Sequence, residues 1–267
     1  MPDGLILNFS VIFALIPAAL LGRRSEHARD NMYWLLLCVA TLGPFVACTA
    51  KLSGEWHTDL ATSIWVTIAA SMVLFSFIAI LTREAWRLTP LISLYMIILG
   101  GFAMIWEHAG EPKLLESATS GTWVGLHITV SVGTYAMVTI AAVAALGAVI
   151  QERALKTKQH GPLNRLLPSV ADCDELVVRL LAVSEIVLAL GLLSGMALQF
   201  ADNGMVLVMS HKVILTITAF VVIGGILITH FRSGLRGRKA ARIVLLAYLL
   251  MTLGYPGVKF VSDIVIG

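Results

Sequence analysis

Charged residues are scarce in this chain of 267 residues, and their scarcity limits what the protein can be. Asp, Glu, Lys and Arg make up 13% of the sequence, whereas soluble domains average about 25%. Hydrophobic residues make up 58%, and the mean hydropathy is +0.88. No polar stretch is long enough to form a soluble domain of its own. We therefore predict a single integral membrane domain over residues 1–267.

Several features that would indicate other classes of protein are also missing. The net charge of +3 is small and its basic residues are dispersed, which argues against a nucleic-acid partner. Three cysteines do not make a disulfide framework. A zinc motif such as H-E-x-x-H is absent. The first residues, MPDGLILNFS, lack the basic region of a cleavable signal peptide, so we expect none.

Eight apolar runs predict an all-α fold, a polytopic membrane helix bundle with about eight transmembrane helices. Each run approaches the ~20 residues that a helix needs to cross a bilayer. The runs cover residues 5–22, 33–51, 61–82, 88–106, 122–150, 177–200, 207–230 and 240–262.

The charges of the loops predict how the bundle is oriented. Lys and Arg gather after the first, third, fifth and seventh runs, and the alternate loops carry few of them. By the positive-inside rule the basic loops are cytoplasmic, so both termini lie outside. We expect a multi-pass membrane protein, with the lipid bilayer as its main partner.

The longest basic loop, residues 151–176, has the spacing of a short membrane-surface helix near residues 163–170. Pro168 should interrupt that helix. Asp172 and Glu175 have the spacing of a capping box, which predicts that the next helix begins there.

The fifth run carries His127, the only strongly ionisable side chain between Thr122 and Gln151. An ionisable residue inside a span is costly and is a candidate functional residue for that reason. Ser131, Thr134 and Tyr135 follow at helical spacing and share its face. The alternative is structural: His127 could bond locally to a side chain such as Ser131 or Tyr135 and hold the helices together.

With this topology the histidines fall into groups by depth. His57, His108, His127 and His211 are expected near the outer surface, and the last two lie within spans. Two imidazoles on different helices of an apolar bundle suit the iron of a haem. We predict His127 and His211 as ligands of haem iron. His57, His108, His230 and Tyr135 are further candidates for cofactor binding.

Glu185 is a second ionisable residue that lies within a predicted span. It lies eight residues after the start of the sixth run, which suggests a position near the cytoplasmic side. His230, at the inner end of the seventh run, has a similar predicted depth. We expect the two side chains to share a polar patch; alternatively, Glu185 snorkels to the surface or bonds within the bundle.

Four segments in order resemble the cytochrome c assembly protein family, in the HemX/YpjD-type branch related to the CcsA and CcmC haem-handling proteins. The resemblance covers residues 122–262 best. The segments are WVGLHITVSVGTYAM at 123–137, LPSVADCDEL at 167–176 with GLLSG at 191–195, HKVILTITAF at 211–220, and HFRSGLRGRKAAR at 230–242 with YPGVKF at 255–260.

This resemblance implies a haem-handling protein of cytochrome c biogenesis. His127 falls on the family's L-H position, His211 on the H-K of the branch, and His230 on its H-x-R. Other cytochrome c assembly proteins are the implied partners. The family's tryptophan-rich W-G-x-x-W-x-W-D signature and its late external histidine are absent, so we do not expect this chain alone to be an enzyme that acts as a haem lyase.

Two other functions fit the same sequence. The first is a HemX-like regulatory membrane scaffold without bound haem, which would act through its cytoplasmic loops. The second is a transporter of haem or of a small ion, with Glu185 and His230 on its path. The visible spectrum of the purified protein separates them from a haem-binding protein, because only bound haem gives a Soret band.

Overall fold

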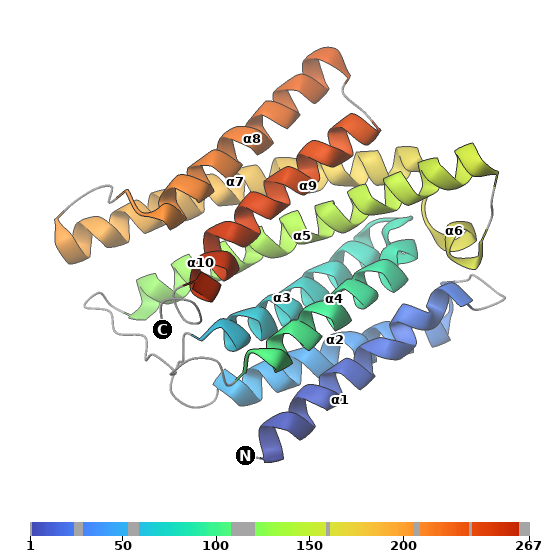
Figure 1. Cartoon of the computed structure of the whole chain (residues 1–267), viewed down its shortest axis with the longest axis horizontal. Helices are drawn as coiled ribbons and strands as arrows, with labels where there is room; N and C mark the ends of the chain where they lie inside the picture. Colours follow the sequence, from blue (N-terminus) through green and yellow to red (C-terminus); the bar gives the residue numbers. More distant parts are fainter. Residues whose placement is uncertain are drawn as a thin grey trace.

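The computed structural model is a bundle of long helices that run in alternating directions, and no strand occurs within the residues it describes (Figure 1). Those residues are 2–23, 29–52, 59–107, 121–158, 161–204, 209–234 and 237–261. The α-helices are α1 (Pro2–Ala19), α2 (Asn31–Leu52), α3 (Leu60–Leu81), α4 (Thr89–Ile105), α5 (Gly121–Thr157), α6 (Pro162–Leu166), α7 (Val170–Asn203), α8 (His211–Ser233), α9 (Arg238–Thr252) and α10 (Val258–Phe260). The short turns η1 (Leu20–Arg23) and η2 (Ala85–Leu88) are 3₁₀-helical, and η3 (Leu253–Gly257) is π-helical.

Seven helical segments of the described residues are each long and apolar enough to cross a membrane, which confirms the polytopic helical bundle. The eighth predicted span, 240–262, is also helical but is interrupted. Its α-helical part, α9, has 15 residues and passes into η3, which contains Pro256. Proline has no N–H to donate and disturbs α-helical bonding, so a π turn at this point is expected. The start of α1 and the α10 segment lie at the same end of the bundle (Figure 1), as eight passes require.

Helix α5 lies at the centre of the bundle, between α1–α4 on one side and α7–α9 on the other (Figure 1). In the most apolar 18-residue stretch of α5, 78% of the residues are buried. The corresponding value for α8, which lies at the periphery, is 17%. Its middle is rich in alanine, including Ala141, Ala144 and Ala145, all buried. Small side chains let neighbouring backbones approach closely, and α5 packs most extensively against α7.

The loop between α5 and α7 is held against the bundle by hydrogen bonds to its backbone. The predicted surface helix is present as α6 and ends before Pro168. Gln151 Nε2 donates to the carbonyl oxygens of Asn164 and Leu167, at 2.9 and 3.1 Å. Arg87 Nε donates to the Leu166 carbonyl at 2.6 Å.

The start of α7 corrects the predicted capping box. Ser169 is the N-cap, and its hydroxyl and the Asp172 carboxylate each accept from the other residue's backbone N–H. The helix therefore begins at Val170, seven residues before the predicted span. Asp172 and Glu175 interrupted the apolar run in the sequence, but a helix that projects from the membrane carries such charges at no cost.

An ion pair and a hydrogen bond connect three helices at the end of the bundle opposite to α6 (Figure 1). Lys51 Nζ, at the end of α2, lies 2.7 Å from Glu107 Oε1, just after α4. Asn8 Nδ2 of α1 donates to the other oxygen of Glu107 at 2.5 Å. The Lys51 and Glu107 side chains are each only 18% exposed, so the pair is shielded from solvent and connects the outer ends of these helices.

Candidate functional site

The ring of His127 points from α5 toward α7 and is fixed there by a hydrogen bond. His127 Nδ1 lies 2.9 Å from Ser194 Oγ. The ring also packs on Gly195, because a Cβ added at that glycine would lie 3.1 Å from His127 Cε1. His127 is half-buried. The sequence allowed His127 a structural role through a hydrogen bond to a nearby side chain. Such a bond is present, but its partner is Ser194 and not Ser131 or Tyr135.

The hydrogen bonds of Ser194 decide which nitrogen of His127 carries a proton. Ser194 Oγ donates to the Gly191 carbonyl oxygen at 3.0 Å, and a serine hydroxyl has one proton to donate. With that proton directed to Gly191, Ser194 accepts from His127, and the tautomer that matches this arrangement carries its proton on Nδ1. In the neutral imidazole this leaves the lone pair on Nε2. Histidines that bind metals show this arrangement, one nitrogen donating to the protein and the other facing the metal.

His211 is the first residue of α8 and is exposed. Helices α5 and α8 begin at the same end of the bundle (Figure 1), so His127 and His211 both belong to that end. Helix α7 packs against both α5 and α8. No hydrogen bond among the described residues joins the two histidines, so their shared ligation of haem stays a prediction.

The remaining histidine candidates are placed differently. His57 and His108 lie outside the described residues. His230 lies 19 residues after His211 on α8, about 28 Å along the helix axis. It packs edge-on against Phe231 at the opposite end of the bundle. His230 therefore cannot bind the same ligand as His211.

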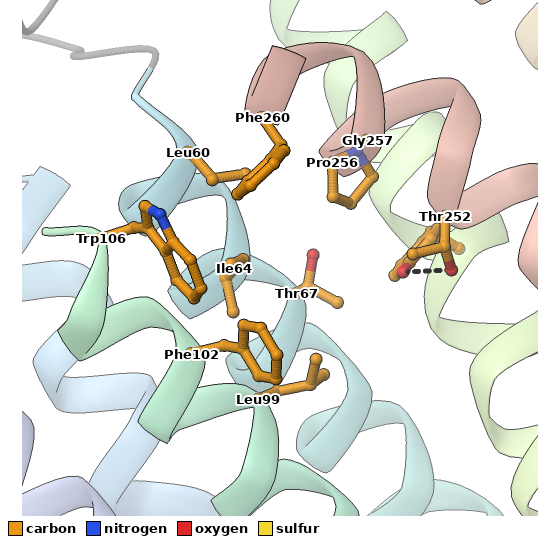
Figure 2. A pocket seen from close by; sticks show the side chains of 11 residues that line it. Leu60, Ile64, Thr67, Leu99, Phe102, Trp106, Thr252, Pro256, Gly257 and Phe260 are labelled. Carbon is orange, nitrogen blue, oxygen red and sulfur yellow. Dashed lines mark hydrogen bonds between the residues drawn. The ribbon is translucent and has the colours of Figure 1, made fainter. Parts of the chain in front are cut away.

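An apolar cavity of about 290 Å³ lies at the same end as His127, between α3, α4, α5 and the segment after α9 (Figure 2). Figure 2 shows Trp106, Phe102 and Phe260 around its wall, with the Thr67 hydroxyl in its lining. None of the described residues that line it is charged. The lining consists of Leu60, Ile64, Thr67, Leu99, Phe102, Trp106, Tyr135, Thr252, Pro256, Gly257 and Phe260.

Tyr135 lines this cavity and belongs to a chain of hydroxyl groups that crosses the bundle. Its hydroxyl lies 3.0 Å from Thr252 Oγ1 and 3.3 Å from the Tyr248 hydroxyl. Tyr248 is also hydrogen-bonded to Tyr95 of α4. Because the hydroxyl of Tyr135 is engaged in this network, its role here is to join α4, α5 and α9 beneath the cavity. A contact of Tyr135 with haem stays a prediction.

Glu185 lies beside the middle of α8. Its Oε1 lies 3.0 Å from the position of a Cβ on Gly224, in the middle of α8. Gly224 precedes His230 by six residues, about 9 Å along the axis. Glu185 Oε2 is buried and has no hydrogen-bond partner in the described part of the chain, so the expected patch with His230 is not formed through this oxygen.

Sequence reasoning singled out His127 and Tyr135 but missed their surroundings. Ser194 and Gly195 lie in the segment GLLSG at 191–195, which resembles the family, but nothing in the sequence marked them as neighbours of His127, because serine and glycine are common in membrane helices. Trp123, one turn before His127 on the same face of α5, is 56% exposed, and it was not singled out from the sequence as a site residue. The cavity draws its walls from segments far apart in the sequence, so no single motif marks it.

The topology and the site define a class: a polytopic helical membrane protein with a histidine oriented at its outer end. Comparison with known proteins specifies the family. The model of the cytochrome c assembly protein family matches residues 30–266, and the chain belongs to that family. The match therefore includes residues 30–121, which precede the segments that carry the resemblance in the sequence.

Two relatives extend over the whole chain. An Azospirillum brasilense protein, named as an uncharacterized 28.8 kDa protein in the nifR3-like 5′ region, is 44% identical over 272 residues, covering 100% of both chains. The inner membrane protein YpjD of Escherichia coli K12 is 24% identical over 263 residues, covering 97% of both chains. No solved structure matches the chain.

Proposed function

We propose that this polytopic inner-membrane protein binds haem and handles it during cytochrome c biogenesis, with His127 as an axial ligand. The observation that carries the proposal is the hydrogen bond of His127 Nδ1 to Ser194. With the Ser194 proton directed to Gly191, His127 donates through Nδ1, and in that tautomer Nε2 keeps its lone pair. Haem iron accepts axial imidazole nitrogen, so the residues around His127 fit the ligand that the family implies.

Other side chains at the same end support a large planar ligand. Trp123 and Leu126 of α5 are 56% and 50% exposed, and together they offer apolar surface beside His127 on which a porphyrin could pack. His211, exposed at the start of α8, is the proposed second ligand. The exposure of His211 leaves its ring free to turn toward a ligand at this end. His57 and His108 are the next candidates if His211 is not used.

The test is a titration of the detergent-purified protein with haem, followed by its visible spectrum. The wild type should develop the Soret band of a histidine-ligated haem, and His127→Ala should lose it or shift it. His230→Ala is the matched control, because His230 lies at the far end of α8 and should leave the spectrum unchanged. A wild type that stays without a bound haem spectrum would contradict the proposal and favour the scaffold or transporter alternatives.

A further inference from the structure

Glu185 lies near the middle of the membrane, and the length of α8 fixes this depth. Helix α8 has 23 residues, about 34 Å at the α-helical rise, which matches a hydrocarbon core of about 30 Å. Gly224 lies about 14 Å from the inner end of α8, at Ser233. Since Glu185 Oε1 lies 3.0 Å from the Cβ position of Gly224, the carboxyl group is held at that depth.

No opposite charge compensates this carboxyl group within the described residues. Glu185 Oε2 is buried without a hydrogen-bond partner, and none of the ion pairs there includes Glu185. The two helices that pack against α7 are α5 and α8. Among the side chains that the structure describes, the titratable residues that flank this depth are Arg179 on α7, Lys212 and His230 on α8, and His127, Tyr135 and Glu152 on α5.

Three of these flanking groups are bonded to other residues. Arg179 is bonded to Glu175, and the Tyr135 hydroxyl is bonded on the side of α9. His127 bonds to Ser194, which is nine residues from Glu185 and therefore on the opposite face of α7. An unpaired carboxylate in an apolar interior is costly, and such groups become neutral by binding a proton.

We propose that Glu185 is a proton-binding site at the contact between α7 and α8. The carboxylate takes one proton from water and becomes neutral as α8 packs against it. It returns that proton to water when the contact opens and water reaches Oε2. Closing of this contact is thereby coupled to uptake of one proton, a property separate from haem binding because Glu185 and Ser194 occupy opposite faces of α7.

Carbodiimide labelling of the full-length protein in membranes tests this site. Dicyclohexylcarbodiimide is apolar, and a protonated carboxyl group adds across its C=N bond to give a stable N-acylurea without loss of any atom. We expect mass spectrometry of the peptides to locate this adduct on Glu185 at neutral pH. The adduct should decrease severalfold at alkaline pH and be absent in Glu185→Gln. A water-soluble carbodiimide should label the exposed Glu175 and spare Glu185.

Two glycine variants test whether the contact with α8 keeps the carboxyl group of Glu185 protonated. In Gly224→Ala the new Cβ would lie 3.0 Å from Oε1, tighter than an ordinary contact, so the carboxyl group must shift and its labelling by the soluble reagent should increase. Gly225→Ala is the matched control, because nothing lies within 4 Å of its Cβ position, and it should behave as the wild type. Labelling of Glu185 by the soluble reagent as readily as Glu175 in the wild type, or no labelling by the apolar reagent at any pH, would overturn the proposal.

Discussion

His127 Nδ1 lies 2.9 Å from Ser194 Oγ, and the proton of that hydroxyl is donated to the Gly191 carbonyl oxygen. This relationship links the central helix α5 to α7 and leaves Nε2 as the nitrogen that can bind a metal. The predictions that follow separate this role of His127 from a purely structural one.

Ser194→Ala should weaken haem binding while leaving the fold intact. Removal of the group that orients a metal-binding histidine typically costs about 10–100-fold in metal affinity, and we expect a loss in that range in a haem titration. Ser184→Ala is the matched control, since Ser184 makes the same type of bond to the carbonyl three residues earlier but does not contact His127. Equal affinities in the two variants would show that Ser194 does not orient the ligand.

Gly195→Ala should lower haem affinity without lowering stability. The added Cβ would lie 3.1 Å from His127 Cε1, so the ring must move from its place on α7. Alanine is favoured over glycine within a helix by about 1 kcal/mol, so thermal unfolding should occur at the same or a higher temperature. Gly133→Ala on α5, where nothing lies within 4 Å, should leave the Soret band unchanged. A wild-type spectrum in Gly195→Ala would mean that the observed ring position is not used for binding.

Glu107→Gln should destabilise the N-terminal half of the bundle. The change leaves the positive charge of Lys51 without its partner in a position that is only 18% exposed. Breaking a buried pair costs about 3–5 kcal/mol, and partial exposure should reduce this to about 1–3 kcal/mol. Unfolding of the detergent-solubilised protein by heat measures the loss. Glu175→Gln, whose pair with Arg179 is 61–68% exposed, should change little; an equal loss in both would contradict the account.

The orientation of the bundle is tested by reporters at two sites. A reporter fused after Gly267 should be found outside, and one inserted at Lys158 should be cytoplasmic, because the basic loops stay inside. Both reporters on the same side of the membrane would refute the eight-pass topology.

Most of the fold could be predicted because bilayer thickness sets the length of each apolar run. The errors occurred where a helix and its apolar run differ in extent. Helix α7 continues beyond the apolar run through Asp172 and Glu175, and Pro256 interrupts the last span.

The candidate site was only partly predictable. His127 could be identified because an ionisable residue in a span is rare. Its partner Ser194 is 67 residues away, and their contact depends on how α7 is rotated about its axis, which the apolar pattern does not define. The cavity beside Tyr135 depends in the same way on how four segments pack together.

The most direct test of the central claim is the Soret band of haem-reconstituted His127→Ala, His211→Ala and the double variant. Each single variant should shift or weaken the band, because each removes one proposed axial imidazole, and the double variant should lose it. All variants should elute as the wild type does in size-exclusion chromatography. A double variant that keeps the wild-type spectrum would contradict the account and move the search for ligands to His57 and His108.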